Sequence, residues 1–118
     1  MNIIAIFLLA LALDPAGAQQ KNPVTASAES VASGGKLYSR YCAACHGKEG
    51  KGDGLAGAKL NPKPSNLTDD EWKHGSADSD IFLVIHDGVK DTGMKAFGSR
   101  VTEHESWDLI NYIRSLKQ

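Results

Sequence analysis

Two cysteines and a histidine in the segment Cys42-Ala43-Ala44-Cys45-His46 restrict the possible folds of this chain more than any other feature. The cysteines lie three positions apart, close to one helical turn, so their sulfur atoms project from the same side. The imidazole of His46 follows directly, and the two alanines between the thiols are small. The spacing predicts one site that both thiols and the imidazole share.

The C-x-x-C-H spacing is typical of covalent haem attachment, in which two thiols reach the two vinyl groups on one edge of a porphyrin. The imidazole of His46 then binds the iron, and the alanines leave space for the macrocycle. Three other interpretations stay open, namely a structural disulfide, a thiol–disulfide redox pair and a zinc site. A redox pair usually lies between a strand and a helix, and no strand pattern is visible here. The further histidines lack the paired spacing of a zinc finger; they are His74, His86 and His104.

The composition supports a cofactor in the core. The chain has 118 residues, enough for one domain or two at most. It carries only three Phe, three Tyr and two Trp, and its two cysteines cannot form a multi-disulfide scaffold. A bound haem would supply the missing apolar core of so small a domain. The 13 Lys and Arg balance 14 Asp and Glu, which excludes a polybasic nucleic-acid binder.

The amino-terminal segment predicts export. Residues 3–13 are an uninterrupted apolar run, shorter than the roughly 20 residues of a membrane-spanning helix. The run ends at Asp14-Pro15 and precedes Ala16-Gly17-Ala18, an A-x-A pattern. We therefore expect a signal peptide over residues 1–18, cleaved after Ala18, and a periplasmic or otherwise exported protein without a stable membrane span. A retained segment and a buried core helix are the alternatives.

The rest of the chain predicts an all-α fold of three to four helices and long loops. Residues 19–32 form an expected polar linker, and residues 33–118 the domain. Leu37, Tyr38 and Tyr41 share one face of a helix that runs into Cys42 and ends near Gly47. Residues 47–64 hold five glycines and two prolines, which indicates a loop and not a phosphate-binding cradle.

Three further helices are expected after this loop. Thr68 and Glu71 form a capping-box pattern that predicts a short helix. A second helix should start near Asp78 or Ser79 and stop at Gly88. A second capping box at residues 102–105 opens the final helix, whose apolar face carries Trp107, Leu109, Ile110, Ile113 and Leu116.

Met94 is the candidate for the sixth position of the iron. It is the only methionine that remains once Met1 leaves with the signal peptide. A thioether is a soft, neutral ligand that favours reduced iron, so His/Met ligation raises the reduction potential. Core filling is the ordinary role of a lone methionine, and the rival ligands are His74, His86 and His104.

With these features the sequence resembles the class I (mono-haem) cytochrome c family, and within it the small periplasmic c-type cytochromes. The resemblance covers about residues 33–116 and rests on Gly34, Tyr38, the C-x-x-C-H motif and the segment Leu109-Ile110-Asn111-Tyr112-Ile113. It implies a cytochrome c fold around one covalent haem c. It also implies that the first and last helices cross where Gly34 meets Tyr112.

Two loops carry further parts of this resemblance. Residues 60–64 resemble the loop whose proline carbonyl accepts a hydrogen bond from the haem-binding imidazole, which implies Pro62 or Pro64. Met94 and Phe97 resemble the distal-ligand loop, although Lys95 stands where many relatives have proline.

The expected function is one-electron transfer between redox partner proteins, without enzymatic activity. His46 and Met94 would be the iron ligands, and Cys42 and Cys45 the covalent attachment. Two alternatives stay open: a haem enzyme or gas sensor with an open distal site, and the electron-transfer subunit of a larger dehydrogenase or oxidase. In the second case the face around Ile81 and Phe82 would contact another chain. Lysines near the expected haem rim would attract an acidic partner; they are Lys48, Lys51, Lys59, Lys63 and Lys95.

Overall fold

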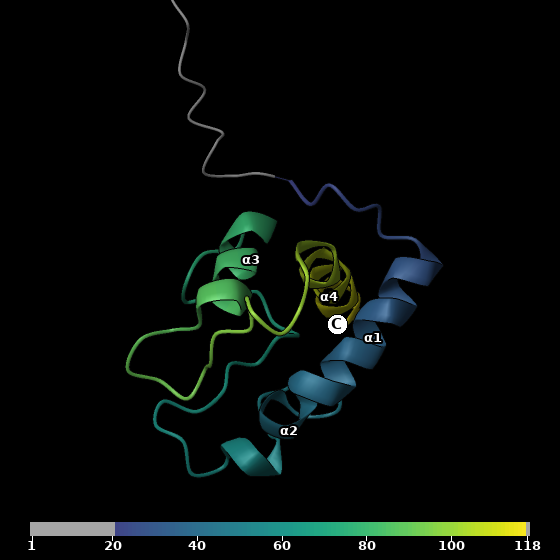
Figure 1. Ribbon diagram of the computed structural model, residues 1–118. Helices are drawn as coiled ribbons and strands as arrows, with labels where there is room; N and C mark the ends of the chain where they lie inside the picture. Colours follow the sequence, from purple (N-terminus) through teal and green to yellow (C-terminus); the bar gives the residue numbers. More distant parts are fainter. Residues whose placement is uncertain (1–20, 118) are drawn as a thin grey trace, which may run out of the picture.

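The computed structural model describes residues 21–117, and these form helices joined by long loops (Figure 1). No strand occurs among the described residues, as expected for an all-α fold. The predicted signal peptide, residues 1–18, lies outside this part of the chain. Of the helices in residues 21–117, none has the length and hydropathy needed to cross a membrane. The elements are α1 (Ala28–Tyr41), α2 (Ala43–His46), the 3-10 turn η2 (Leu55–Gly57), α3 (Asp78–Asp87) and α4 (Glu103–Ser115).

The first and last helices, α1 and α4, cross in direct contact (Figure 1). A Cβ atom on Gly34 would lie 2.0 Å from the Asp108 carbonyl oxygen and 2.8 Å from Tyr112 Cβ, so only glycine fits at the crossing. Beside it, the rings of Tyr38 and Tyr112 have centroids 5.1 Å apart. The predicted contact between Gly34 and Tyr112 is confirmed.

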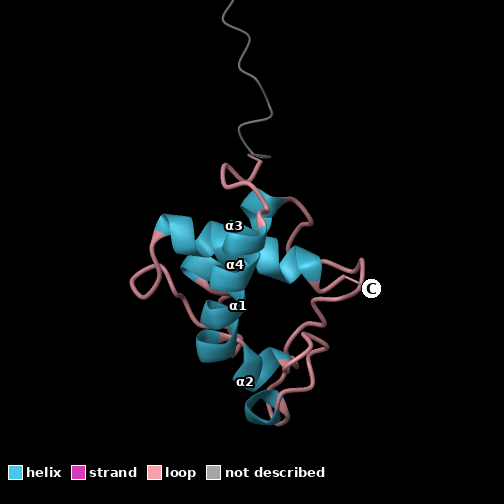
Figure 2. Ribbon diagram, turned by 90° about the vertical axis from the view of Figure 1, so that its right-hand side faces the viewer, coloured by secondary structure: helices cyan, strands magenta, loops and turns pink. Residues whose placement is uncertain are grey.

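Helix α3 packs on α4, which separates it from α1 (Figure 2). The Phe82 ring stacks on Trp107 with 4.5 Å between the centroids. Ile81 and Ile85 are buried in the same core. Ile81 therefore packs within this domain, whereas Phe82 stays partly exposed. The expected contact of this face with another chain stays a prediction.

Helix α1 begins five residues before the expected domain boundary at residue 33. The side chain of Ser27 accepts a hydrogen bond from the Ser30 amide and caps the helix. Farther upstream, Asn22 Nδ2 donates to the Trp107 carbonyl at 3.1 Å and to Asn111 Oδ1 at 2.9 Å. Much of the expected linker is therefore either helical or bonded to α4.

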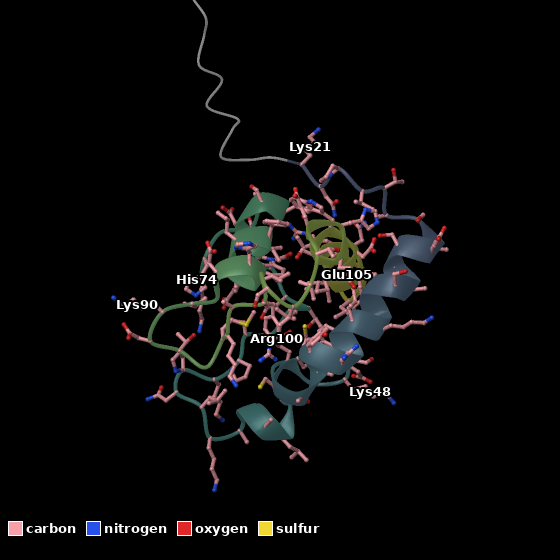
Figure 3. The ribbon with its side chains drawn as sticks, in the orientation of Figure 1. Lys21, Lys48, His74, Lys90, Arg100 and Glu105 are labelled. Carbon is pink, nitrogen blue, oxygen red and sulfur yellow. The ribbon has the colours of Figure 1, made fainter. Side chains whose placement is uncertain are left out.

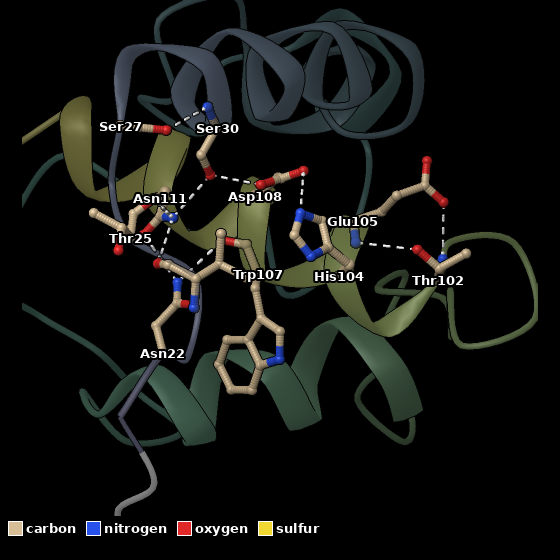
Figure 4. A network of polar contacts seen from close by, with 11 residues as sticks. Asn22, Thr25, Ser27, Ser30, Thr102, His104, Glu105, Trp107, Asp108 and Asn111 are labelled. Carbon is tan, nitrogen blue, oxygen red and sulfur yellow. Dashed lines mark hydrogen bonds and ion pairs between the residues drawn. The ribbon is translucent and has the colours of Figure 1, made fainter.

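A buried polar network joins α1, α4 and the segment before α1 (Figure 4). Ser30 Oγ donates to Asp108 Oδ1 at 2.5 Å, and Asn111 Nδ2 donates to Ser30 Oγ at 2.9 Å and to the Val24 carbonyl at 3.0 Å. Because the side chains of Ser30, Asp108 and Asn111 are all hydrogen-bonded, their burial costs little and the network fixes the angle between the helices. The Trp107 indole points the other way, towards α3.

The helix boundaries around α3 and α4 follow the sequence signals. Gly88 ends α3 with φ 68°, in the left-handed region that glycine adopts without strain. At the start of α4, Thr102 and Glu105 form the expected reciprocal capping box.

The short helix expected at residues 68–71 is absent. The Thr68 amide and hydroxyl both donate to Asn66 Oδ1, at 2.8 and 2.6 Å, so the threonine side chain turns backwards instead of capping a helix. The Glu71 amide likewise donates to Asp69 Oδ1 at 3.0 Å. Side-chain acceptors two residues upstream thus satisfy the amides that a helix would have used.

Candidate functional site

The site begins where α1 gives way to α2. Cys42 joins the two helices, and the Cys45 and His46 amides both donate to its carbonyl oxygen, at 3.2 and 2.9 Å. Gly47, with φ 87°, ends α2 immediately after the histidine. The motif therefore occupies a single helical turn, as its spacing predicts.

Cys42, Cys45, His46 and Met94 line one cavity of about 350 Å³. Met94 reaches it from the loop between α3 and α4, far along the chain from the cysteines. Loops from both halves of the chain complete the wall, and most of the lining is apolar. Its apolar residues include Tyr41, Leu60, Leu67, Trp72, Ile81, Val84, Ile85, Val89, Phe97 and Ile113.

His46 is oriented by a backbone carbonyl, but not by the residue expected. Its Nδ1 lies 2.9 Å from the Ser65 oxygen, so neither Pro62 nor Pro64 supplies the acceptor. The Pro64 carbonyl instead lies 2.6 Å from the position of a Cβ on Gly52, so it faces the glycine loop. Because a carbonyl only accepts, Nδ1 carries the proton and Nε2 is left with its lone pair.

The electrostatic surroundings of His46 keep its ring neutral. Burial lowers the pKa of the imidazole, and the hydrogen bond to the Ser65 carbonyl opposes this only in part. A neutral imidazole with a free Nε2 lone pair is the form that binds a metal ion. His46 thus has the protonation state that binding of a metal ion through Nε2 requires.

The two thiols are free and half-buried, with no disulfide between them. Burial raises the pKa of the Cys42 thiol to about 12, with a smaller contribution from Cys45. A thiol–disulfide redox pair needs a lowered thiol pKa, so this environment does not suit one. No group of three His, Cys, Asp or Glu side chains within residues 21–117 is arranged to hold a metal ion.

Of the three rival histidines, one shares the cavity with Met94. His74 belongs to its lining. His86 instead stacks on Phe82 at 6.1 Å and contacts Asp87. His104 lies on α4, mostly exposed, with Nε2 3.6 Å from Asp108 Oδ2.

The cavity lining carries five cationic side chains against one carboxylate, Glu71. Two of the expected rim lysines belong to it, Lys63 and Lys95, whereas Lys51 pairs with Glu49 at 3.4 Å. Figure 3 shows Lys48 at the periphery of the molecule, and Arg100, although it lines the cavity, is exposed. Three of the cations were not expected from the sequence, namely Arg40, Lys73 and Arg100. The only sequence signal for them is the position of Arg40, two residues before Cys42.

The residues present fit a haem. The cavity offers an apolar wall for a flat macrocycle, cations for its carboxylate side chains, two free thiols, and a neutral imidazole with a free nitrogen. These are the groups that covalent attachment and iron binding require.

Comparison with known proteins agrees with this fit. A family model described as "Cytochrome C oxidase, cbb3-type, subunit III" matches residues 29–113. Similar curated proteins include cbb3-type cytochrome c oxidase subunits CcoP from Rubrivivax gelatinosus, 37% identical over 71% of this chain, and from Azospirillum sp., 33% identical over 73%. The alignments cover 25% and 30% of those two relatives, so the chain corresponds to less than a third of their length.

Solved structures with a similar fold include one named as a c-type cytochrome and one chain of a larger protein complex. A chain of the Kuenenia stuttgartiensis reducing HAO-like protein complex Kustc0457/Kustc0458 superposes with a TM-score of 0.75 at 30% identity, over 81% of this chain and 47% of that one. The KustC0563 c-type cytochrome superposes with a TM-score of 0.61 at 28% identity, over 72% of this chain and 98% of its own.

Together these findings define a c-type cytochrome domain with haem c as its cofactor. The chain belongs to the family of cytochrome c oxidase, cbb3-type, subunit III.

Proposed function

We propose that this protein carries single electrons between exported redox proteins through one haem c held by Cys42, Cys45, His46 and Met94. The observation that carries the proposal is the convergence of these four side chains on one cavity. When bound, haem c supplies an iron that takes up and releases one electron. With His46 and Met94 both held to the iron, electron transfer would need no proton donor or nucleophile from the protein.

Each residue has a distinct task in this proposal. Cys42 and Cys45 tether the macrocycle by thioether bonds, and His46 binds the iron through Nε2 while the Ser65 carbonyl orients its ring. Met94 would supply the second protein ligand, a neutral thioether that favours reduced iron. The apolar wall would keep water from the iron, which also favours the reduced state because reduced iron carries the lower charge.

The proposed setting is the periplasm or another exported compartment. Its support is the A-x-A pattern ending at Ala18, after which residues 19–118 would form the mature protein. Relatives are named as subunits of an oxidase, and one structural neighbour belongs to a multi-protein complex. Service as the electron-transfer subunit of a larger redox complex is therefore the second candidate, and it uses the same site.

The test is an absorbance spectrum of protein exported through a cytochrome c maturation pathway, with intact mass and a denaturing haem assay. We expect one covalent haem, a six-coordinate low-spin spectrum and a weak sulfur-to-iron charge-transfer band when oxidised. The ferrous protein should not bind carbon monoxide. A colourless chain without added mass would refute the proposal.

Two matched variants separate the candidate distal ligands, because both side chains line the cavity. Met94→Ala should remove the charge-transfer band, lower the reduction potential and admit carbon monoxide. His74→Ala should leave all three unchanged. An unaltered protein without the charge-transfer band, in which His74→Ala but not Met94→Ala admits carbon monoxide, would assign the sixth position to His74. Carbon monoxide binding by the unaltered protein would favour a gas sensor or enzyme.

A further inference from the structure

The loop that carries Met94 connects α3 to α4, and a single threonine side chain braces it. The Met94 amide donates to Thr92 Oγ1 at 3.1 Å, and the Thr92 hydroxyl donates to the Val89 carbonyl at 2.8 Å. The Met94 carbonyl in turn accepts from the Val89 amide at 3.1 Å. Both backbone polar groups of Met94 are thus bonded, one of them through a side chain.

Downstream of Met94, the backbone itself anchors the loop to the end of α3. The Phe97 and Gly98 amides donate to the Ile85 and His86 carbonyls at 2.8 and 3.1 Å. Gly88 lets the loop approach closely, because a Cβ there would lie 2.7 Å from the Met94 oxygen and 2.8 Å from the Ala96 nitrogen. This half of the loop therefore needs no side chain to hold its position.

Upstream of Met94, the loop has less intrinsic rigidity. Gly93 directly precedes the methionine, and Asp91 adopts a left-handed φ of 62°, which is unfavourable for a residue with a side chain. Lys95 follows Met94, so no proline ring restricts the chain there. The Thr92 hydroxyl is the side-chain group that bridges this part of the loop, from Val89 to Met94.

We propose that Thr92 is a positioning residue, whose hydroxyl holds Met94 where its sulfur binds the haem iron. The inference rests on the proposed function, since it takes Met94 as the distal ligand. A neutral thioether competes with other ligands only while its loop stays closed. Loss of the bridge raises the fraction of open loop, and a competing ligand binds more tightly in proportion to that fraction.

The experiment is a titration of the oxidised holoprotein with imidazole, which competes with the thioether for iron. Thr92→Val removes the hydroxyl at nearly constant shape, and Thr92→Ser keeps it. Thr102→Val is the matched control, because it removes a threonine hydroxyl that bonds to Glu105 at the start of α4 and takes no part in the hydrogen bonds of Val89, Thr92 and Met94. If the Thr92→Val protein is not recovered with haem, Thr92→Ala provides the same comparison.

We expect Thr92→Val to tighten imidazole binding roughly 5- to 30-fold, the equivalent of one or two lost hydrogen bonds. Thr92→Ser and Thr102→Val should bind imidazole as the unaltered protein does. Wild-type affinity in both Thr92→Val and Thr92→Ala, or an equal gain in Thr102→Val, would overturn the inference alone. If the unaltered protein lacks the sulfur-to-iron band, Met94 ligation fails and this inference fails with it.

Discussion

Gly34→Ala tests whether the crossing of α1 and α4 holds the domain together. The added Cβ would lie 2.0 Å from the Asp108 carbonyl oxygen and 2.6 Å from its carbonyl carbon. Both atoms belong to the backbone of α4, so no side-chain rotation relieves the overlap. The shorter distance is about 1.4 Å below the 3.4 Å at which ordinary contact begins, and the helices must separate by a similar amount.

The cost of this separation can be isolated with a neighbouring glycine. Overpacking costs about 1–3 kcal/mol and sometimes more, and a backbone clash belongs at the upper end, near 3 kcal/mol. Alanine regains about 1 kcal/mol over glycine within a helix, so Gly34→Ala should lose about 2 kcal/mol net. At Gly35 a Cβ would meet only Tyr112 ring atoms, at 3.1 and 3.2 Å, and the ring can move. Gly35→Ala gains the same propensity and should change stability by less than about 1 kcal/mol.

The assay is guanidinium unfolding of both holoproteins, followed by far-ultraviolet circular dichroism and by haem absorbance. A difference of about 2–3 kcal/mol is a large share of the roughly 5–15 kcal/mol that stabilises a domain. Because both glycines lie in α1, helix propensity cancels and the difference reports the crossing. Equal unfolding free energies for the two variants would refute the role assigned to Gly34.

Two further predictions concern the alkaline limit of stability and the charge around the cavity. Tyr38 is buried and donates to the Gly47 carbonyl at 2.6 Å, and burial raises its pKa above the ordinary 10.0. The phenol must stay protonated in the folded state, so stability is intact below pH 10 and falls as the pH rises further. Tyr38→Phe should cost about 1 kcal/mol at pH 7, because one of the two hydrogen bonds to the Gly47 carbonyl is lost while the Gly50 amide still donates to it. The variant should also flatten this alkaline loss in urea titrations between pH 7 and 11. The second prediction concerns charge: the double variant Lys63→Glu, Lys95→Glu should be oxidised several-fold more slowly by the anion hexacyanoferrate(III) at low salt, as measured by stopped flow. The rate should also depend less on salt concentration. Unchanged rates would show that neither lysine steers the approach of an anionic partner.

The sequence patterns that the structure confirms depend on contacts between residues close together in the chain. The C-x-x-C-H spacing, the capping box of Thr102 and Glu105, and the stop at Gly88 each depend on one helical turn. The pattern at Thr68 failed although it has the same form, because Asn66 lies two residues upstream and takes the donor groups first. A capping pattern predicts a helix only when no closer acceptor competes.

The backbone carbonyl that accepts a hydrogen bond from His46 could not be identified from the sequence, for a different reason. Residues 60–64 marked the correct loop, but the bond goes to Ser65, directly after the second proline. Which carbonyl faces the imidazole depends on where the loop meets Gly52 and its neighbours in space. That meeting joins distant segments, so no local pattern could have selected it.

By itself, the sequence determined the chemistry of this protein: two thiols and an imidazole in one turn, one methionine beyond the amino-terminal apolar run, and amphipathic helices with few large aromatic residues. The tertiary structure decided which distant groups complete the site. Met94 faces the cavity because Gly88 and Val89 seat its loop on α3, and Ser30, Asp108 and Asn111 are buried because α1 and α4 bring them together. Residue types and spacings set what a group can do, whereas packing between distant segments sets what it meets.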